Sequence, residues 1–306
     1  MKSELTWGAL LHLGYNFWDD AKAADHVRCD EPVWREVTER MAAHGMNLLL
    51  IDLGEAVAYP SHPELAVAGS WSVDKLRDEL ERLRGMGLEP VPKLNFSTCH
   101  DAWLKEYGRM VSTSEYYGVC KDLIRDVCEI FGRPRLFHLG FDEENAWQQR
   151  RYPQTVIRQG DLWWHDLLLL AKEVERNGAR PWVWSDKCWG DRWSEFERRM
   201  PRSVLQSNWY YYKEFAEPAP HNRMRCVRAY DMLDKAGFDQ MPTGSNWDND
   251  VNMSSTVAYC CEHVSSERLK GFLAAPWKST TQDKLELLLR GMDQIGECRN
   301  KWKCKE

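Results

Sequence analysis

Two adjacent carboxylic acids, Asp142 and Glu143, follow the apolar run 136–141. In an extended chain, neighbouring side chains point to different sides, and two adjacent negative charges help to keep one carboxyl protonated near neutral pH. Glycoside hydrolysis needs such an acid for the leaving oxygen and a second group that supports the positive charge at the sugar carbon. The pair is therefore a candidate for acid/base chemistry, although Asp-Glu-Glu alone is most often a helix N-terminal charge.

Aromatic and polar side chains end the other predicted strands, and the chain contains 16 Trp among 306 residues. A pyranose has apolar faces and a ring of hydroxyls, so its site needs aromatic platforms and hydrogen-bonding groups. Singly, each Trp is more often a core residue, and His138 could be a buried histidine of the core. Together they predict a carbohydrate site that includes Asn16, Trp18, Asn95, His100, His138, Trp184, Asp186, Trp209, Tyr210, Asn246, Trp247 and Trp277.

Strands and helices alternate along the whole chain. Short apolar or β-branched runs predict strands over residues 7–15, 47–52, 89–96, 135–140, 181–185, 204–210, 239–243 and 271–275. Apolar residues three and four apart, with Gly or Pro at the ends, predict helices over residues 32–44, 72–84, 117–131, 161–177, 195–200, 223–235, 254–263 and 285–295. Eight strand–helix pairs at this length favour a closed (β/α)8 barrel, an α/β fold with one domain over residues 1–306. No Gly-rich nucleotide-binding motif supports an open doubly wound sheet.

The composition excludes several other classes of protein. A formal net charge of −6 does not provide the basic face of a nucleic-acid binder, and no apolar run reaches the roughly 20 residues of a membrane span. Ten cysteines without a C-x-x-C spacing, several of them in helical apolar stripes, are expected to be free thiols in a reducing compartment. The first residues lack a signal-peptide pattern, so we expect a cytoplasmic chain, although a removed signal would leave no trace. We expect no cofactor and no metal.

The segment Phe137-His138-Leu139-Gly140-Phe141-Asp142-Glu143 resembles the H-x-G-x-D-E signature of glycoside hydrolase family 20, the β-N-acetylhexosaminidases. The resemblance implies a (β/α)8 barrel in which this motif ends the fourth strand. It also implies that Glu143 is the general acid/base. Asp142 would orient the 2-acetamido group of the substrate, which attacks the anomeric carbon in place of an enzyme nucleophile.

Weaker similarities extend the resemblance along the chain. Residues 92–100 look like the P-E-x-D-x-P-G-H segment of the family, residues 181–186 resemble its fifth-strand W-x-D, and Trp209, Trp247 and Trp277 match its aromatic cage. The sequence departs from the family where Lys93 and Asn95 replace acids. It also has no arginine in residues 13–18 and no evident tyrosine donor in residues 243–247.

Three alternatives stay open. A substrate without an acetamido group would need a second carboxylate, for which Asp186 and Asp52 are the candidates. A metal-dependent sugar isomerase or epimerase could draw nitrogen and oxygen ligands from His100, His138, Asp142, Glu143 and Asp186, although no metal-binding spacing supports it. The departures at strands one and three also fit a non-catalytic carbohydrate-binding barrel.

Overall fold

The computed structural model describes residues 5–14, 24–150, 155–156, 158–216 and 221–301. Eight parallel strands lie in the order β6-β5-β4-β3-β2-β1-β8-β7. They are β1 (Thr6–His12), β2 (Leu48–Asp52), β3 (Glu89–Lys93), β4 (Leu136–His138), β5 (Arg180–Trp184), β6 (Leu205–Ser207), β7 (Thr243–Gly244) and β8 (Gly271–Ala274). Parallel bridges between Gln206 and Gln240 and between Trp209 and Thr243 join β6 to the β7 side. The strands therefore form a nearly closed barrel, which confirms the predicted (β/α)8 fold.

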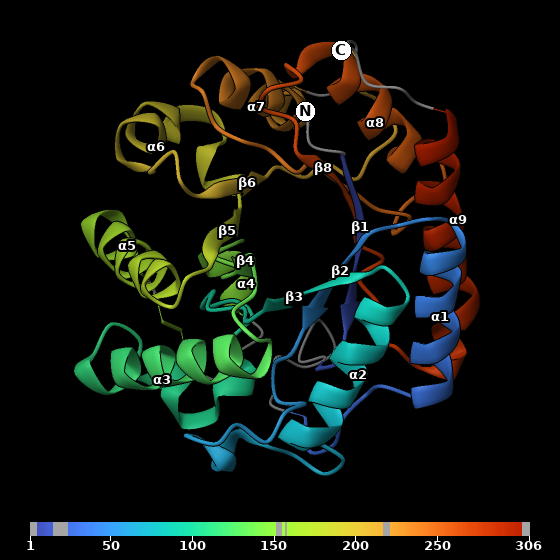
Figure 1. The fold of residues 1–306 in the computed structure, drawn as a ribbon. Coiled ribbons are helices and arrows are strands. Elements are labelled where there is room, and N and C mark those ends of the chain that lie inside the picture. The colour runs from blue at the N-terminus through green and yellow to red at the C-terminus, as the bar shows by residue number, and fades with distance from the viewer. Residues whose placement is uncertain (1–4, 15–23, 151–154, 157, 217–220, 302–306) are drawn as a thin grey trace.

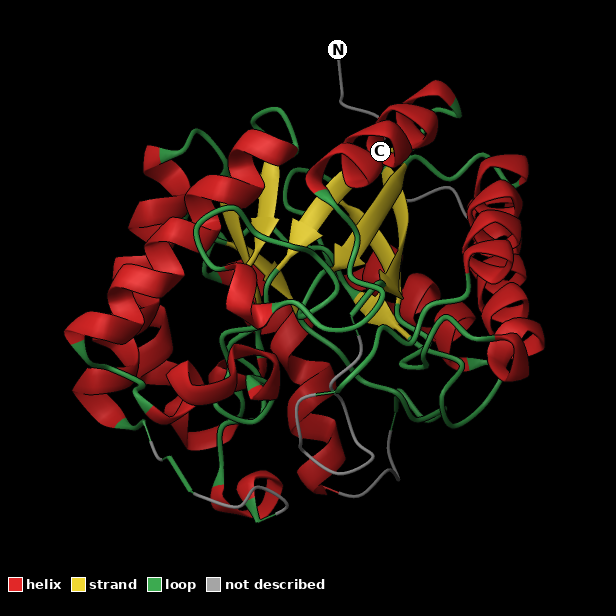
Figure 2. Ribbon diagram, turned by 90° about the horizontal axis from the view of Figure 1, so that it is seen from below, coloured by secondary structure: helices red, strands yellow, loops and turns green. Residues whose placement is uncertain are grey.

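Helices surround this barrel, as Figures 1 and 2 show from two directions. They are α1 (Glu31–Ala43), α2 (Val73–Gly85), α3 (Ser114–Ile130), α4 (Ala146–Gln149), α5 (Gly160–Arg176), α6 (Trp193–Arg199), α7 (His221–Lys235), α8 (Asn252–His263) and α9 (Leu285–Lys301). Local signals set several boundaries: Ser72 accepts a hydrogen bond from the Lys75 amide at the start of α2, and Gly87 adopts φ 82° after its end. Among the described residues, no helix is long and apolar enough to cross a bilayer.

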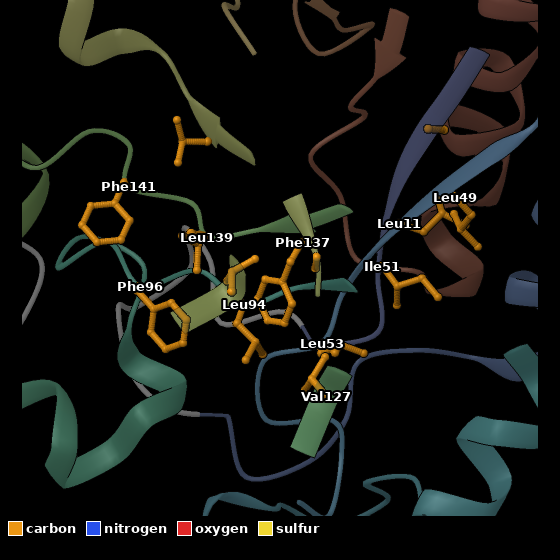
Figure 3. Close-up of a cluster of buried hydrophobic side chains, with 14 of the residues drawn as sticks. Leu11, Leu49, Ile51, Leu53, Leu94, Phe96, Val127, Phe137, Leu139 and Phe141 are labelled. Carbon is orange, nitrogen blue, oxygen red and sulfur yellow. The ribbon is translucent and has the colours of Figure 1, made fainter. Parts of the chain in front are cut away.

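Alternation along the strands divides the core into two layers. Successive strand residues face opposite sides, so Leu10, Leu50 and Trp182 belong to a small group inside the barrel. Leu11 and Ile51, paired in register, belong to the larger core between strands and helices. Figure 3 shows that outer core, to which β1 to β4 and their continuations contribute Leu and Phe side chains. The inner layer changes from apolar to polar toward the carboxyl ends of the strands, which directs attention to that end of the barrel.

Several strands are shorter than predicted: those predicted over 89–96 and 204–210 are regular only over Glu89–Lys93 and Leu205–Ser207. The predicted strand 239–243 is wrong in its bounds, because Pro242 has no amide hydrogen for a ladder and regular pairing begins at Thr243. β4 ends at His138 rather than Gly140, since Gly140 and Phe141 adopt φ values of 76° and 67°.

Among the cysteines that the structure describes, all but one are free, as expected. The free thiols are Cys29, Cys99, Cys120, Cys128, Cys188, Cys226, Cys260 and Cys298. Cys261 instead is disulfide-bonded, contrary to the expectation that all thiols are free.

Candidate active site

The backbone turns sharply where β4 ends and the carboxylate pair begins. Gly140, Phe141 and Glu143 adopt φ values of 76°, 67° and 55°, a region that costs side-chain-bearing residues energy and that concentrates at functional sites. A Cβ on Gly140 would lie 1.9 Å from Asn95 Oδ1, so only glycine allows β3 and β4 to approach so closely here. The strained turn places Asp142 beside residues that follow β3.

Three polar groups surround Asp142. Asn95 Nδ2 donates a hydrogen bond to Asp142 Oδ1 at 3.1 Å, and His100 Nε2 lies 3.4 Å from Asp142 Oδ2 and 3.3 Å from Glu143 Oε2. Burial would lower the pKa of His100, but the charge of Asp142 and hydrogen bonding with both carboxylates outweigh it and raise the pKa to about 10. Burial would likewise raise the pKa of Asp142, but the charge and hydrogen bond of His100, together with the charge of Lys93 and the hydrogen bond from Asn95, outweigh burial, and the pKa lies below its ordinary value. An ionised Asp142 thus faces an imidazolium.

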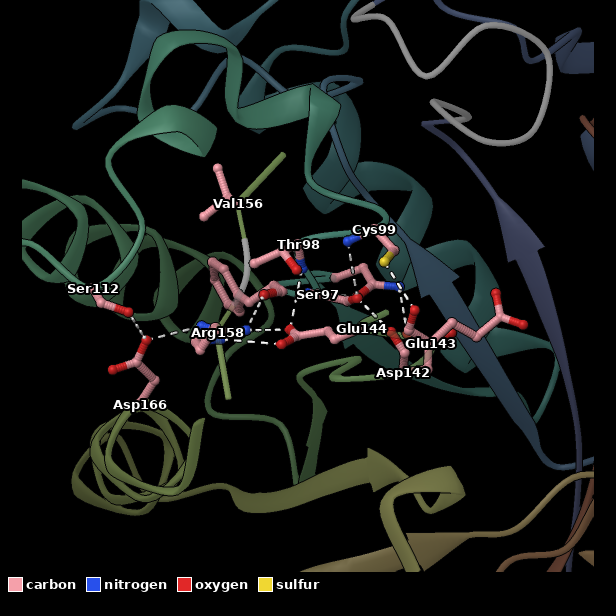
Figure 4. A network of polar contacts seen from close by, with 12 residues as sticks. Ser97, Thr98, Cys99, Ser112, Asp142, Glu143, Glu144, Val156, Arg158 and Asp166 are labelled. Carbon is pink, nitrogen blue, oxygen red and sulfur yellow. Dashed lines mark hydrogen bonds and ion pairs between the residues drawn. The ribbon is translucent and has the colours of Figure 1, made fainter. Parts of the chain in front are cut away.

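Side chains hold the backbone of the pair from both sides (Figure 4). Ser97 Oγ donates to the Asp142 carbonyl, and Cys99 Sγ donates to the Glu143 carbonyl at 2.9 Å. From β5, Asp186 Oδ2 accepts a hydrogen bond from the Glu143 amide at 3.1 Å. These contacts satisfy the main-chain groups of a turn that has no ladder partner, so both carboxylates are fixed in position.

A buried arginine supports the next residue. Arg158, with a fully buried side chain, pairs with Glu144 and also with Asp166, whose oxygen lies 3.1 Å from Nη1. Glu144 in turn accepts a hydrogen bond from the Thr98 amide at 3.1 Å. A buried charge is tolerated only when it is paired in this way. The network ties the segment after β3 to the segment after β4.

Two further groups couple electrostatically to the pair. Burial, followed by the charge of Asp142, raises the pKa of Asp186 to about 7. Burial also raises the pKa of Tyr211 well above its ordinary value, a neighbouring Trp277 lowers it, and the charges of Glu143, Asp142 and Asp186 raise it further. The Tyr211 hydroxyl therefore stays protonated and can donate a hydrogen bond, and Tyr211 borders the same cavity as the carboxylates.

An aromatic cavity of about 680 Å³ opens at the pair. Its size falls in the range of about 300–1,000 Å³ that is typical of ligand pockets. The described residues that border it are Asp142, Glu143, Trp147, Gln148, Trp189, Trp209, Tyr210, Tyr211, Tyr212, Arg223, Cys226, Trp247 and Trp277. Rings continue from Trp189 to Trp209 (centroids 4.5 Å apart) and from Trp209 to the stacked Tyr211 (5.1 Å). The cavity therefore offers acids at one end and stacking surfaces along its wall.

The structure brings together most of the predicted site residues. Asp142, Glu143, Trp209, Tyr210, Trp247 and Trp277 border the cavity, and Asn95, His100 and Asp186 contact the carboxylate pair. Asn16 and Trp18 lie outside the described residues. Tyr210 is buried and its hydroxyl donates to the Glu214 carbonyl at 2.8 Å. Tyr211, which sequence reasoning did not select, also borders the cavity and couples electrostatically to the acids.

Three predicted residues neither border the described wall of the cavity nor contact the carboxylate pair. His138 and Trp184 point into the barrel because they occupy inward positions of β4 and β5, and their rings pack 4.4 Å apart. The Gly140 amide donates to His138 Nδ1 at 3.0 Å. Asn246 Nδ2 donates to the Leu287 carbonyl at 2.8 Å and so anchors α9. Trp184 still supports the site indirectly, since its ring lies 5.5 Å from that of Trp277.

A second polar group lies inside the barrel, below the cavity. Lys93, buried on β3, pairs with Asp52 of β2, and His12 Nδ1 lies 3.4 Å from the same Asp52 oxygen. Burial disfavours the charged form of Asp52, but the charge of Lys93 and the contacts with His12 lower its pKa to about 2. Asp52, a candidate second carboxylate, is thus engaged by a lysine.

Three site residues could together hold a cation. Ligand atoms of His100, Asp142 and Glu143 lie within 4.8 Å of one another, and such nitrogen and oxygen donors suit a divalent metal. His100 would first have to release its proton, which its pKa of about 10 disfavours.

The barrel is similar to those of glycoside hydrolase family 20. The N-acetyl-β-hexosaminidase of Streptomyces plicatus matches with a TM-score of 0.66 and 14% identity over 95% of this chain and 64% of that one. The chitobiase of Flavobacterium johnsoniae matches with a TM-score of 0.67 and 17% identity over 95% of this chain and 48% of that one. The β-N-acetylhexosaminidase of Bacteroides fragilis matches with a TM-score of 0.63 and 13% identity over 94% of this chain and 65% of that one. The chain thus spans about half to two thirds of the length of these structures.

These similarities confirm the predicted resemblance at the level of the fold. No family model and no curated protein sequence matches the chain. At 13–17% identity the shared feature is a family 20-like barrel, in divergent form.

Proposed function

We propose that this chain is a glycoside hydrolase that removes a terminal N-acetylhexosamine by substrate-assisted, retaining cleavage. The observation that carries the proposal is the carboxylate pair itself: Asp142 and Glu143 sit on a strained turn at the end of β4, and both border an aromatic cavity. Structural similarity to β-N-acetylhexosaminidases supports the same assignment, and one solved structure of the S. plicatus protein contains the product GlcNAc.

The proposed reaction uses the substrate's own acetamido oxygen as nucleophile. Glu143 donates a proton to the glycosidic oxygen while that bond breaks and the acetamido oxygen bonds to the anomeric carbon. The resulting oxazolinium ion carries a positive charge on the acetamido group, which the ionised Asp142 stabilises through the nitrogen. Glu143 then takes a proton from the water that reopens the ring, and the sugar leaves with its configuration retained. Tyr211, whose hydroxyl stays protonated and which borders the same cavity, is a suitable donor to the acetamido oxygen.

Two observations favour this mechanism over one with an enzyme nucleophile. Asp52 pairs with Lys93 inside the barrel and does not border the described wall of the cavity. Asp186 has a pKa raised to about 7, so it holds its proton to higher pH than a nucleophilic carboxylate should. Neither Asp52 nor Asp186 is therefore suited to act as the nucleophile, and the acetamido group of the substrate supplies it.

The test is hydrolysis of a panel of aryl glycosides that differ only in the terminal sugar. We expect turnover of the N-acetyl-β-hexosaminides, and we expect Glu143→Gln to abolish it for substrates with poor leaving groups. Glu115→Gln, an exposed acid in the first turn of α3, is the matched control and should behave as wild type. Absence of any activity that depends on Glu143 would overturn the proposal, and sugar binding that survives Glu143→Gln without turnover at any pH would favour a binding barrel.

A further inference from the structure

The outer part of the cavity differs in chemistry from the carboxylate end. Two tryptophans there are unusually exposed, Trp147 by 64% and Trp247 by 52% of their surface, and both border the cavity. Large apolar side chains left open at the edge of a pocket are typical of ligand-binding surfaces. If the terminal sugar lies against Asp142 and Glu143, these rings are available to the group on the other side of the scissile bond.

Arg223 adds a positive charge to the wall of this cavity. It lies in the first turn of α7, half-buried, and borders the cavity. Its guanidinium carbon lies 3.7 Å from the centroid of the Tyr212 ring. Stacking on an aromatic face fixes the plane of a guanidinium while its N–H groups remain free to bind an anion in two-pronged fashion.

The partners of Arg223 differ from those of other partly buried arginines. Arg158 binds Glu144 and Asp166, and Arg180 binds Asp239 at 2.9 Å. Within the described part of the chain, Arg223 has no carboxylate within ion-pair distance, and its contact is the Tyr212 ring. Since charges that are partly removed from water are normally paired, the missing carboxylate is one that a ligand can provide.

The wall of one cavity therefore carries charges of both signs. Asp142 and Glu143 would repel an acidic sugar placed against them, whereas Arg223 borders the same cavity beside the Tyr212 ring. We propose that the leaving-group side of the cavity recognises a ring that bears a carboxylate or sulfate. This inference rests on the proposed hydrolase function. The substrate class would be a neutral terminal N-acetylhexosamine linked to an acidic sugar.

The test compares three substrates with the same terminal N-acetylhexosamine and a neutral hexose, a hexuronate or a sulfated hexose as the leaving group. We expect wild-type kcat/KM to be about 10-fold higher for an acidic leaving group, the size of one charge-assisted hydrogen bond. The advantage should fall with added salt. Arg223→Gln should remove this advantage, mainly by raising KM for the acidic substrates. The better of the two acidic substrates identifies the group.

The matched control is Arg225→Gln, an exposed arginine two residues along α7 that does not border the described wall of the cavity. It should retain the preference. Equal kcat/KM for neutral and acidic substrates, or equal effects of the two substitutions, would overturn the inference. If nothing is hydrolysed, the proposed function fails on its own, and tryptophan-fluorescence titration with the same saccharides still decides the subsite. The inference is supported if the acidic saccharides bind more tightly than the neutral one and Arg223→Gln removes the difference. Equal binding of acidic and neutral saccharides rejects the inference.

Discussion

The two halves of the barrel mouth are built differently. Around β3, β4 and β5, polar atoms contact one another directly: Asn95 binds Asp142, Cys99 binds the Glu143 carbonyl, and Asp186 binds the Glu143 amide. Around β6 to β8, the wall is made of rings, such as the stacked pair Trp209 and Tyr211. The first half fixes reacting groups in one geometry, whereas the second offers surfaces that tolerate different ligands. Substitutions in the first half should therefore lower kcat, and those in the second should raise KM.

The largest effect is expected for Asp142→Asn. An amide keeps the shape but loses the charge that stabilises the oxazolinium ion, so kcat should fall by roughly 10²–10³-fold, the usual loss for one such group. Because Asp142 acts on the acetamido side, the loss should be similar for good and poor aryl leaving groups. Steady-state kinetics on a series of aryl N-acetyl-β-hexosaminides measures this.

The matched comparison is Glu143→Gln, which should be mild for good leaving groups and severe for poor ones, since only those need a proton. An equal dependence on the leaving group in both variants would mean that the two acids do not have separate roles.

Gly140→Ala tests whether the tight geometry of the first half is necessary. Alanine at φ 76° costs about 1–2 kcal/mol, and its Cβ would meet the buried Asn95 oxygen at 1.9 Å, which adds a further 1–3 kcal/mol or so. We expect Tm to fall by roughly 5–15 °C, with activity lost even where the protein is folded. Thermal unfolding followed by circular dichroism measures the first effect.

Gly132→Ala is the control, because Gly132 has a similar φ of 69° but nothing within 4 Å of an added Cβ. Gly132→Ala should lower Tm by only the cost of alanine at a positive φ, roughly 2–4 °C, and should leave kcat unchanged. Equal loss of Tm in both variants would show that the contact with Asn95 is relaxed at little cost.

The fold was largely predictable because it depends on local patterns. Leucine-rich runs and helical spacings placed all eight strands, although several predicted bounds were too long, and the segment that contains Pro242 was displaced. The acids were predictable because Asp142 and Glu143 are adjacent and follow a strand. By contrast, Arg158 and Tyr211 were not selected, since a loop conformation and not a spacing brings them to the site. Strand alternation was a signal that could have shown that Trp184 faces the barrel interior.

In the aromatic half, Trp247→Ala should raise KM rather than lower kcat. An aromatic contact contributes about 0.5–1.5 kcal/mol beyond burial, which corresponds to a roughly 2- to 10-fold increase in KM. Because Trp247 is 52% exposed, Tm should stay within about 2 °C of wild type. Val251→Ala, another exposed apolar residue nearby in the sequence, should change neither value. A fall in kcat with unchanged KM would contradict the division between the two halves.

The smallest effect is expected for Asp186→Asn, and it is measured as a change in the pH dependence of Tm. The folded pKa of Asp186, about 7, lies above its ordinary value near 4. Between these values the folded protein binds more protons than the unfolded chain, so the free energy of unfolding falls as pH rises from about 4 to 7. Asparagine carries no titrating proton, and its oxygen can still accept from the Glu143 amide. The variant should therefore lose this decline and exceed the wild-type Tm at pH 8 by a few degrees.

Asp101→Asn separates this stability effect from catalysis. Burial also raises the pKa of Asp101 to about 7, so its substitution should flatten the Tm profile over the same pH window, with the same sign. Asp186, however, accepts from the Glu143 amide, and its ionisation adds a negative charge next to the pair that must carry the proton. Asp186→Asn should thus also shift the alkaline limb of kcat, whereas Asp101→Asn should leave that limb in place. If Asp186→Asn also leaves that limb in place, the charge of Asp186 acts on folding alone, and the tightly hydrogen-bonded half of the mouth extends no further than β4.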